Sequence, residues 1–123
     1  MNEYKFKIDT KLPSLNEYIN ACRRNAYSGG NFKKDTDMIC SVFIRNARIP
    51  AITKPVHIRF EWHENTQKRD LDNVAGYGHK TILDALVSCG CLKDDSPKYV
   101  KGFTDDFIKD KKCFCVVTIT ELE

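Results

Sequence analysis

The strongest constraint on the fold is an alternation of apolar and polar residues from Val56 to His63. The apolar members of this stretch are Val56, Ile58, Phe60 and Trp62. Successive side chains of a β-strand point to opposite faces of the sheet, so the pattern predicts a strand with one buried and one exposed face. We therefore expect a sheet with other elements packed on its apolar side.

Hydrophobic spacing predicts the remaining elements. We expect further strands at residues 4–8, 99–103 and 113–121, and helices that begin near Ser14, near Asp35 or Thr36, and near Asp72 or Asn73. The stretch from Arg23 to Asp35 contains Gly29-Gly30 and lacks periodicity, so a mobile loop is expected there. The order strand, helix, helix, strand, helix, strand, strand predicts one α/β or α+β domain over residues 1–123, with a small mixed sheet and helices packed on it.

Composition favours a soluble globular protein. Of the 123 residues, 41% are hydrophobic and 30% are charged. No apolar run approaches the roughly 20 residues of a membrane-spanning helix, and no secretory signal peptide is visible, so a cytoplasmic protein without membrane contact is expected. The net charge of +3 does not by itself indicate a nucleic-acid-binding protein.

Two aspartates, Asp70 and Asp72, follow the predicted strand after a short polar link. If residues 68–72 are extended, both carboxylates point to the same side, where two charges about 4 Å apart repel by about 4 kcal/mol at an effective dielectric constant near 20. A bound cation removes that repulsion, and carboxylate oxygens without a nearby Cys or neutral His favour Mg²⁺. An EF-hand calcium loop is excluded, because it needs a glycine and a glutamate where this chain has Ala75 and Thr81.

A second acidic pair, Asp94-Asp95, comes after the predicted helix that ends at Gly90. It lies in a turn able to fold back beside Asp70 and Asp72, where a third carboxylate would complete a metal site. The alternative is structural, since aspartates are common as helix N-caps and in turns for reasons unrelated to metal binding.

Basic residues form three doublets in predicted loops: Arg23-Arg24, Lys33-Lys34 and Lys68-Arg69. A basic rim around an acidic centre is typical of a nuclease, whose rim holds phosphates and whose centre holds metal. The alternative is an ordinary solvated surface.

The acidic stretch belongs to an ordered set of residues. The set consists of Arg69-Asp70-Leu71-Asp72-Asn73, Lys80, Leu83-Asp84-Ala85-Leu86 and Asp94-Asp95, with Pro13-Ser14-Leu15-Asn16-Glu17-Tyr18 upstream. In order and spacing it resembles the motifs of the RusA family of Holliday junction resolvases, whose N-terminal motif is Pro-Ser-x-Asn-x-Tyr. The resemblance spans most of the chain and rests on the whole set, because Asp-x-Asp-Asn alone is a weak signal.

The resemblance implies an α/β homodimer that binds four-way DNA junctions and cuts them symmetrically with Mg²⁺ in recombination and repair, with no small-molecule cofactor. By position, Asp70, Asp72 and Asp95 match the family's metal-binding carboxylates, and Lys80 matches its active-site lysine. The three basic doublets are then expected to contact DNA. The chain departs from the family in one respect: the interval from Asn73 to Lys80 is longer by about one helical turn.

Six cysteines leave other functions open. Cys89-x-Cys91 and Cys113-x-Cys115 are candidates for a zinc site, although structural zinc ligands are usually separated by two to four residues, and packing in the core is the alternative. The three histidines are expected at the surface. A non-catalytic or zinc-stabilised protein that binds branched DNA, and a nuclease for flaps or other branched structures, remain alternative functions.

Overall fold

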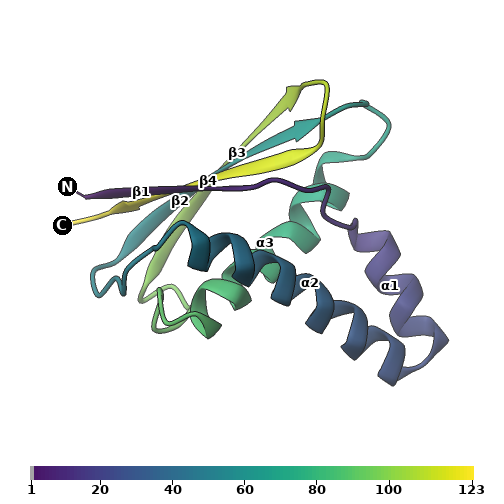
Figure 1. The fold of residues 1–123 in the computed structure, drawn as a ribbon, viewed down its shortest axis with the longest axis horizontal. Helices are drawn as coiled ribbons and strands as arrows, with labels where there is room; N and C mark the ends of the chain where they lie inside the picture. Colours follow the sequence, from purple (N-terminus) through teal and green to yellow (C-terminus); the bar gives the residue numbers. More distant parts are fainter. Residues whose placement is uncertain (1) are drawn as a thin grey trace.

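The computed structural model describes residues 2–123, and within them a four-stranded sheet has helices packed on one of its faces (Figure 1). The strands are β1 (Glu3–Ile8), β2 (Val56–Glu64), β3 (Val100–Lys109) and β4 (Phe114–Glu121). The helices are α1 (Leu15–Arg24), α2 (Ala26–Asn46) and α3 (Leu71–Ser88). The predicted α+β fold and the predicted order of elements are both confirmed.

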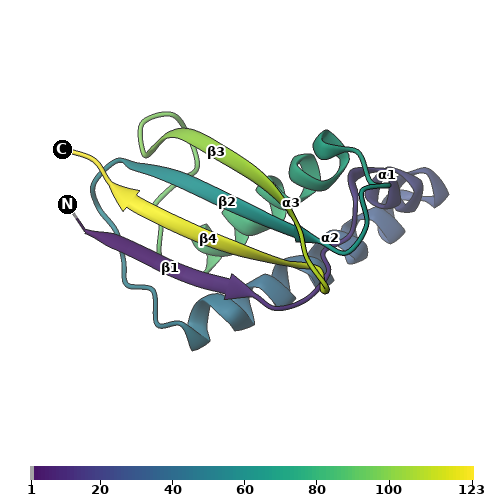
Figure 2. The same ribbon diagram turned by 90° about the horizontal axis from the view of Figure 1, so that it is seen from above.

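The strand order is β1-β4-β2-β3. Strand β4 pairs antiparallel with β1 and with β2, whereas β2 and β3 run parallel (Figure 2). Parallel neighbours need a crossover connection, and α3 forms its main part. The end of β2 and the beginning of β3 therefore lie at opposite ends of the sheet, with α3 between them.

The alternation in β2 produces the expected buried face. The fully or almost fully buried side chains of this strand are Val56, Ile58, Phe60 and Trp62. They belong to one hydrophobic core together with Ile82 and Leu86 of α3. The opposite face of the sheet is polar, since Arg59 of β2 forms an ion pair with Asp106 of β3.

The prediction of a mobile loop from Arg23 to Asp35 is wrong, because α2 begins at Ala26. Asn25 caps this helix by accepting a hydrogen bond of 2.7 Å from the backbone N–H of Ser28. A Cβ atom at Gly29 would lie 2.6 Å from Cys22 Sγ, so Gly29 lets α1 and α2 approach each other closely. The glycine that suggested a loop is instead a packing residue inside a helix.

The two cysteine pairs lie at opposite ends of the sheet. Cys89 and Cys91 follow α3 near the beginning of β2, where Cys91 Sγ lies 3.4 Å from the carbonyl oxygen of Ile49. Cys115 pairs in register with Trp62 near the end of β2. A zinc site built from all four cysteines is therefore not formed within one protomer, and the buried members, Cys91 and Cys115, pack in the core.

Candidate metal and DNA site

Asp70 is the N-cap residue of α3, but its side chain does not cap the helix. Its backbone is extended, with φ −66° and ψ 146°, and its carbonyl oxygen accepts hydrogen bonds of 3.1 Å from the N–H groups of Asn73 and Val74. The carboxylate of an N-cap aspartate usually accepts a hydrogen bond from the backbone N–H of the second or third helical residue, here Asp72 or Asn73. Here the carboxylate of Asp70 stays available to another ligand.

Asp72 lies in the first turn of α3 and is exposed. The expectation that the chain is extended through Asp72 is wrong, because the helix already begins at Leu71. Within residues 2–123, neither Asp70 nor Asp72 has an ion-pair or hydrogen-bond partner for its side chain, unlike Asp84. The positive end of the helix dipole offsets part of their repulsion, and two free carboxylates remain at one helix end.

Asp95 lies at the other end of α3. The helix has 18 residues, so it separates its ends by about 27 Å. Leu92, just before Asp95, forms a bridge with Ile52 near the beginning of β2. The expected convergence of Asp95 with Asp70 and Asp72 therefore does not occur within one protomer, and among residues 2–123 no three His, Cys, Asp or Glu side chains gather as a metal site.

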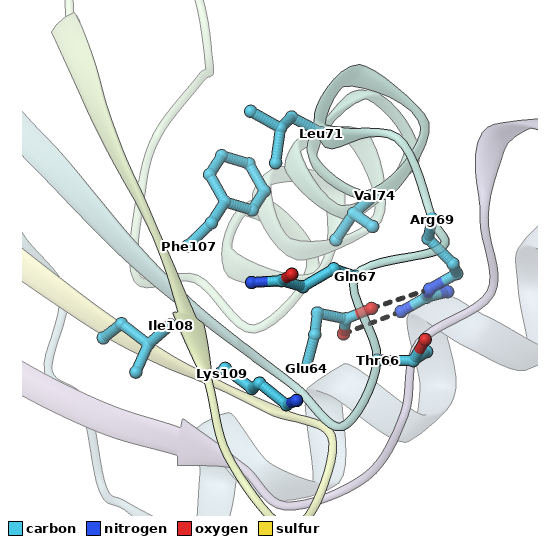
Figure 3. Close-up of a pocket in the computed structure, with 9 residues that line it drawn as sticks. All are labelled: Glu64, Thr66, Gln67, Arg69, Leu71, Val74, Phe107, Ile108 and Lys109. Atoms are coloured by element: carbon cyan, nitrogen blue, oxygen red, sulfur yellow. Dashed lines mark hydrogen bonds and ion pairs between the residues drawn. The ribbon is translucent and has the colours of Figure 1, made fainter.

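Arg69 fixes the backbone that leads into Asp70. Its Nε and Nη2 atoms each donate a hydrogen bond of 2.8 Å to the carboxylate of Glu64 (Figure 3). Its Nη1 donates one of 2.9 Å to the carbonyl oxygen of Leu12. The Arg69 side chain is only 14% exposed. We assign Arg69 to positioning the site, because these contacts already occupy the guanidinium that was expected to bind DNA.

The two halves of the sequence motif meet in space. The backbone N–H of Asn16, at the start of α1, donates a hydrogen bond of 2.8 Å to Asn73 Oδ1, on the first turn of α3. Two residues after Asn16 and four residues after Asn73, the rings of Tyr18 and Tyr77 lie 5.0 Å apart. The N-terminal motif thus supports the helix end that carries Asp70 and Asp72.

Lys80 lies about two helical turns along α3 from Asp72. Its side chain is 60% exposed, and its Nζ lies 3.6 Å from Asp84 Oδ2, toward the C-terminal end of the helix. Such exposed pairs contribute little stability, so this contact does not fix the lysine in place. In this conformation Lys80 does not reach toward the acidic end of α3.

Lys33 is held between α2 and α3. Its Nζ lies 2.6 Å from Asp37 Oδ1 and 2.7 Å from Asp84 Oδ2, and its side chain is only 13% exposed. Burial lowers the pKa of Lys33, but the hydrogen bonds to the two carboxylates outweigh it and raise the pKa above its usual value. Lys33 therefore joins two helices and is not free to bind a phosphate.

The other predicted DNA-binding residues are differently placed. Arg23, Arg24, Lys34 and Lys68 are exposed, and within residues 2–123 none of them forms an ion pair. Arg23 and Arg24 end α1, which begins beside Asn73 and extends about 15 Å from it. Lys68 lies two residues before Asp70.

Two features of the site were not expected from the sequence. His79, predicted at the surface, is half-buried, and its Nε2 lies 2.7 Å from Asp105 Oδ1, which also accepts a hydrogen bond of 2.7 Å from Trp62 Nε1. A pocket also lies beside the start of α3, between Leu71 and Phe107 (Figure 3). Both depend on the pairing of β2 with β3, which no local pattern predicts.

Comparison with known proteins adds no relative: no protein-family model and no curated protein matches the chain. The resemblance to the RusA family therefore rests on the motif residues themselves. Among the helices of residues 2–123, none combines the length and the apolar character that a membrane span requires.

Proposed function

We propose that the protein is a Mg²⁺-dependent, structure-selective endodeoxyribonuclease that cuts branched DNA, four-way junctions above all, in recombination and repair. The observation that carries the proposal is the pair of free carboxylates, Asp70 and Asp72, at the start of α3. Hydrogen bonds from Asn16 and Arg69 hold this end of the helix in place. Within the described part of the chain, residues 2–123, neither carboxylate forms an ion pair or a hydrogen bond.

The donor set fits the proposed metal. Mg²⁺ is usually bound by one or two carboxylates, several waters and the phosphates of the substrate. Asp70 and Asp72 would hold the ion, which, when bound, lowers the pKa of a water molecule and neutralises charge on the phosphate that is cut. Glu64, through Arg69, holds the backbone that leads into Asp70, so Asp70 is positioned before any ligand binds.

A second copy of the chain would supply the third carboxylate. A two-fold axis that crosses α3 near its middle reverses the helix in the partner, which brings Asp95 of the partner subunit to the end that carries Asp70 and Asp72. The free edge of β3 would provide a surface for this contact, because β3 pairs only with β2 among the strands of residues 2–123. Phe103 on that edge is 43% exposed and lies 4.8 Å from the ring of His79, near the middle of α3.

The exposed cations would bind DNA through its phosphates. Lys68 is close to the carboxylates, whereas Arg23 and Arg24 lie at the far end of α1, where they would contact a different stretch of the substrate. Contacts to phosphates position DNA without reading its sequence, so branch geometry and the paired sites of a dimer would set the preference. Lys80 can leave Asp84 to approach the phosphate, since the exposed ion pair is weak.

Cleavage of a labelled four-way junction tests the proposal. Asp70→Asn should lower the Mg²⁺-dependent rate by more than the roughly 10- to 100-fold that changes outside the metal's own ligands typically cause. Asp35→Asn, at an exposed position of α2, is the matched control and should cut like the wild type. Normal cleavage by Asp70→Asn would overturn the proposal.

Among the described residues, 2–123, no third acidic ligand joins Asp70 and Asp72, and this favours a second candidate, a protein that binds branched DNA without cutting it. Junction binding with no cleavage in Mg²⁺ or Mn²⁺ would establish this candidate. Stoichiometric zinc by elemental analysis would establish its zinc-stabilised form.

A further inference from the structure

A pocket with mainly apolar walls lies beside Asp70 of the candidate metal site. It lies between the segment that leads into α3, the first turn of that helix and the end of β3 (Figure 3). Arg69 and Leu71 both line it, so Asp70 stands between two of its wall residues. The pocket therefore adjoins the position of Asp70, one of the two residues that are proposed to bind metal.

The size and chemistry of the pocket limit its occupant. Its volume is about 220 Å³, below the roughly 300–1,000 Å³ of sites for drug-sized ligands, so it suits a small group. Leu71, Val74, Phe107 and Ile108 form apolar walls. Glu64 and Arg69 neutralise each other, which leaves Lys109 as the unpaired charge among the lining residues.

Two polar side chains in the pocket are free to bind a ligand. Within residues 2–123, neither the Gln67 amide nor the Lys109 ammonium has a hydrogen-bond partner. Figure 3 shows Gln67 extending toward the side of the pocket where Phe107 lies. An amide beside an aromatic ring can bind the edge of a planar group while the ring stacks on its face.

We propose that this pocket receives one unpaired nucleobase of the DNA strand that is cut, an inference that rests on the proposed nuclease function. A base is small, planar and uncharged, and it carries hydrogen-bonding edges that match the amide of Gln67. Lys109 would bind the adjoining phosphate. A bare phosphate fits less well, because apolar walls do not replace its water of hydration.

The pocket would then select branched over intact duplex DNA. A base in a duplex must lose its pairing and stacking before it can enter, at a cost of a few kcal/mol, and the cost is least where the base is already unpaired. Pairing is weakest at a branch point, so a strand crossing the branch would place a base in the pocket and its phosphate near Asp70.

The test combines junctions that lack one base with a variant in which the pocket is filled. Junctions with an abasic nucleotide at each position around the branch are bound in Ca²⁺, so that binding is measured without cleavage. At one position, loss of the base should weaken wild-type binding by about 10-fold. Leu71→Trp, at a side chain that is 58% exposed, should fill the pocket, weaken binding to a similar extent and abolish the effect of that abasic nucleotide.

Matched variants make the test specific. Val42→Trp, at another exposed apolar position on α2, should keep the full abasic effect. Gln67→Ala leaves the volume open and should reduce the abasic effect by removing the polar contact. Thermal unfolding of each variant confirms that it is folded.

The possible outcomes separate this inference from the proposed function. The base pocket would be overturned if Leu71→Trp and the abasic nucleotide weakened binding additively. It would also be overturned if no abasic position weakened wild-type binding. Dissociation of a dimer by Leu71→Trp in sedimentation would also overturn it, because the pocket would then belong to the subunit contact. If Leu71→Trp abolishes the abasic effect but the protein does not cut junctions, only the proposed nuclease function is overturned. If the protein does not bind junctions, both the nuclease function and the base pocket are overturned.

Discussion

The backbone N–H of Asn16 donates a hydrogen bond of 2.8 Å to Oδ1 of Asn73, although 57 residues separate the two along the chain. The bond ties the first residues of α1 to the helix turn that contains Asp72. A long-range contact thus connects the N-terminal motif with the acidic motif of the proposed active site.

Removal of this hydrogen bond should lower the stability of the protein. Asn73→Ala should lower the free energy of unfolding by about 1 kcal/mol, the usual net value of one hydrogen bond. Asn73→Asp keeps an acceptor oxygen at the same position and should retain most of that stability in urea unfolding. Equal losses in both variants would show that the hydrogen bond to Asn16 is not the source of the effect.

Substitution of Arg69 should lower stability, whereas substitution of its neighbour Lys68 should weaken DNA binding. Arg69→Lys cannot keep the two-pronged contact with Glu64 together with the bond to Leu12, so it should destabilise the protein by about 2 kcal/mol. Lys68→Ala should leave stability within about 0.5 kcal/mol of the wild type. Under the proposed function it should instead reduce the salt dependence of DNA binding by about one phosphate contact, measured as log Kd against log salt concentration. A stable Arg69→Lys variant with weakened DNA binding would contradict the positioning role.

Substitution by alanine should raise stability at one helical glycine and lower it at another. At Gly30 of α2 a Cβ atom would meet nothing within 4 Å, so Gly30→Ala should stabilise the helix by about 0.5–1 kcal/mol. At Gly78 of α3 a Cβ atom would overlap the buried ring of Trp62, so Gly78→Ala should destabilise the protein by at least about 1–3 kcal/mol. Thermal or urea unfolding measures both. A destabilised Gly30→Ala variant would contradict the helical conformation of this segment.

The contrast between these glycines explains where sequence reasoning succeeds. The strand from Val56 is predicted correctly because its burial follows from alternation within the strand itself. The loop expected from Arg23 to Asp35 is wrong because Gly29 serves a contact with Cys22 of another helix, and a tertiary contact leaves no local signal. Strand order depends in the same way on partners that are distant in the chain.

In the candidate site, too, local features can be predicted from the sequence and tertiary contacts cannot. The sequence predicts Asp70 and Asp72 as candidate metal ligands. It does not predict the contacts of Arg69, because Glu64 and Leu12 become its neighbours only in the fold. The separation of Asp95 was implicit in the length of the helix that precedes it. An 18-residue helix moves the chain about 27 Å, and only a turn back across the molecule or a second subunit could restore the contact.

Alkaline pH should weaken the fold through its buried thiols. Burial raises the pKa of Cys40 to about 12 from its ordinary value of 9.0. Between these values the unfolded chain loses the proton while the folded chain keeps it, so stability is intact below pH 9 and falls as pH rises toward 12. Cys40 alone should cost about 1.4 kcal/mol by pH 10.

Urea unfolding between pH 8 and 10.5 measures this slope. Burial also raises the pKa of Cys91 and of Cys115, so Cys40→Ala should reduce the slope without abolishing it. Val117→Ala, a buried truncation without a titrating group, should lose stability equally at every pH in this range. An unchanged slope in Cys40→Ala would contradict the assignment.

A metal site shared between two subunits should allow two inactive variants to restore each other. In a mixed dimer of Asp70→Asn and Asp95→Asn chains, one site contains both substitutions and the other contains none, because the first subunit keeps Asp95 and the second keeps Asp70 and Asp72. Mixing the variants, with subunit exchange, should therefore recover cutting of one junction strand under the proposed function. Asp70→Asn mixed with Asp72→Asn is the control: each of its two sites retains one substitution, so no cutting should return. Failure of the first mixture, with dimers shown by sedimentation to exchange, would place Asp95 outside the metal site and leave Asp70 and Asp72 as its protein ligands.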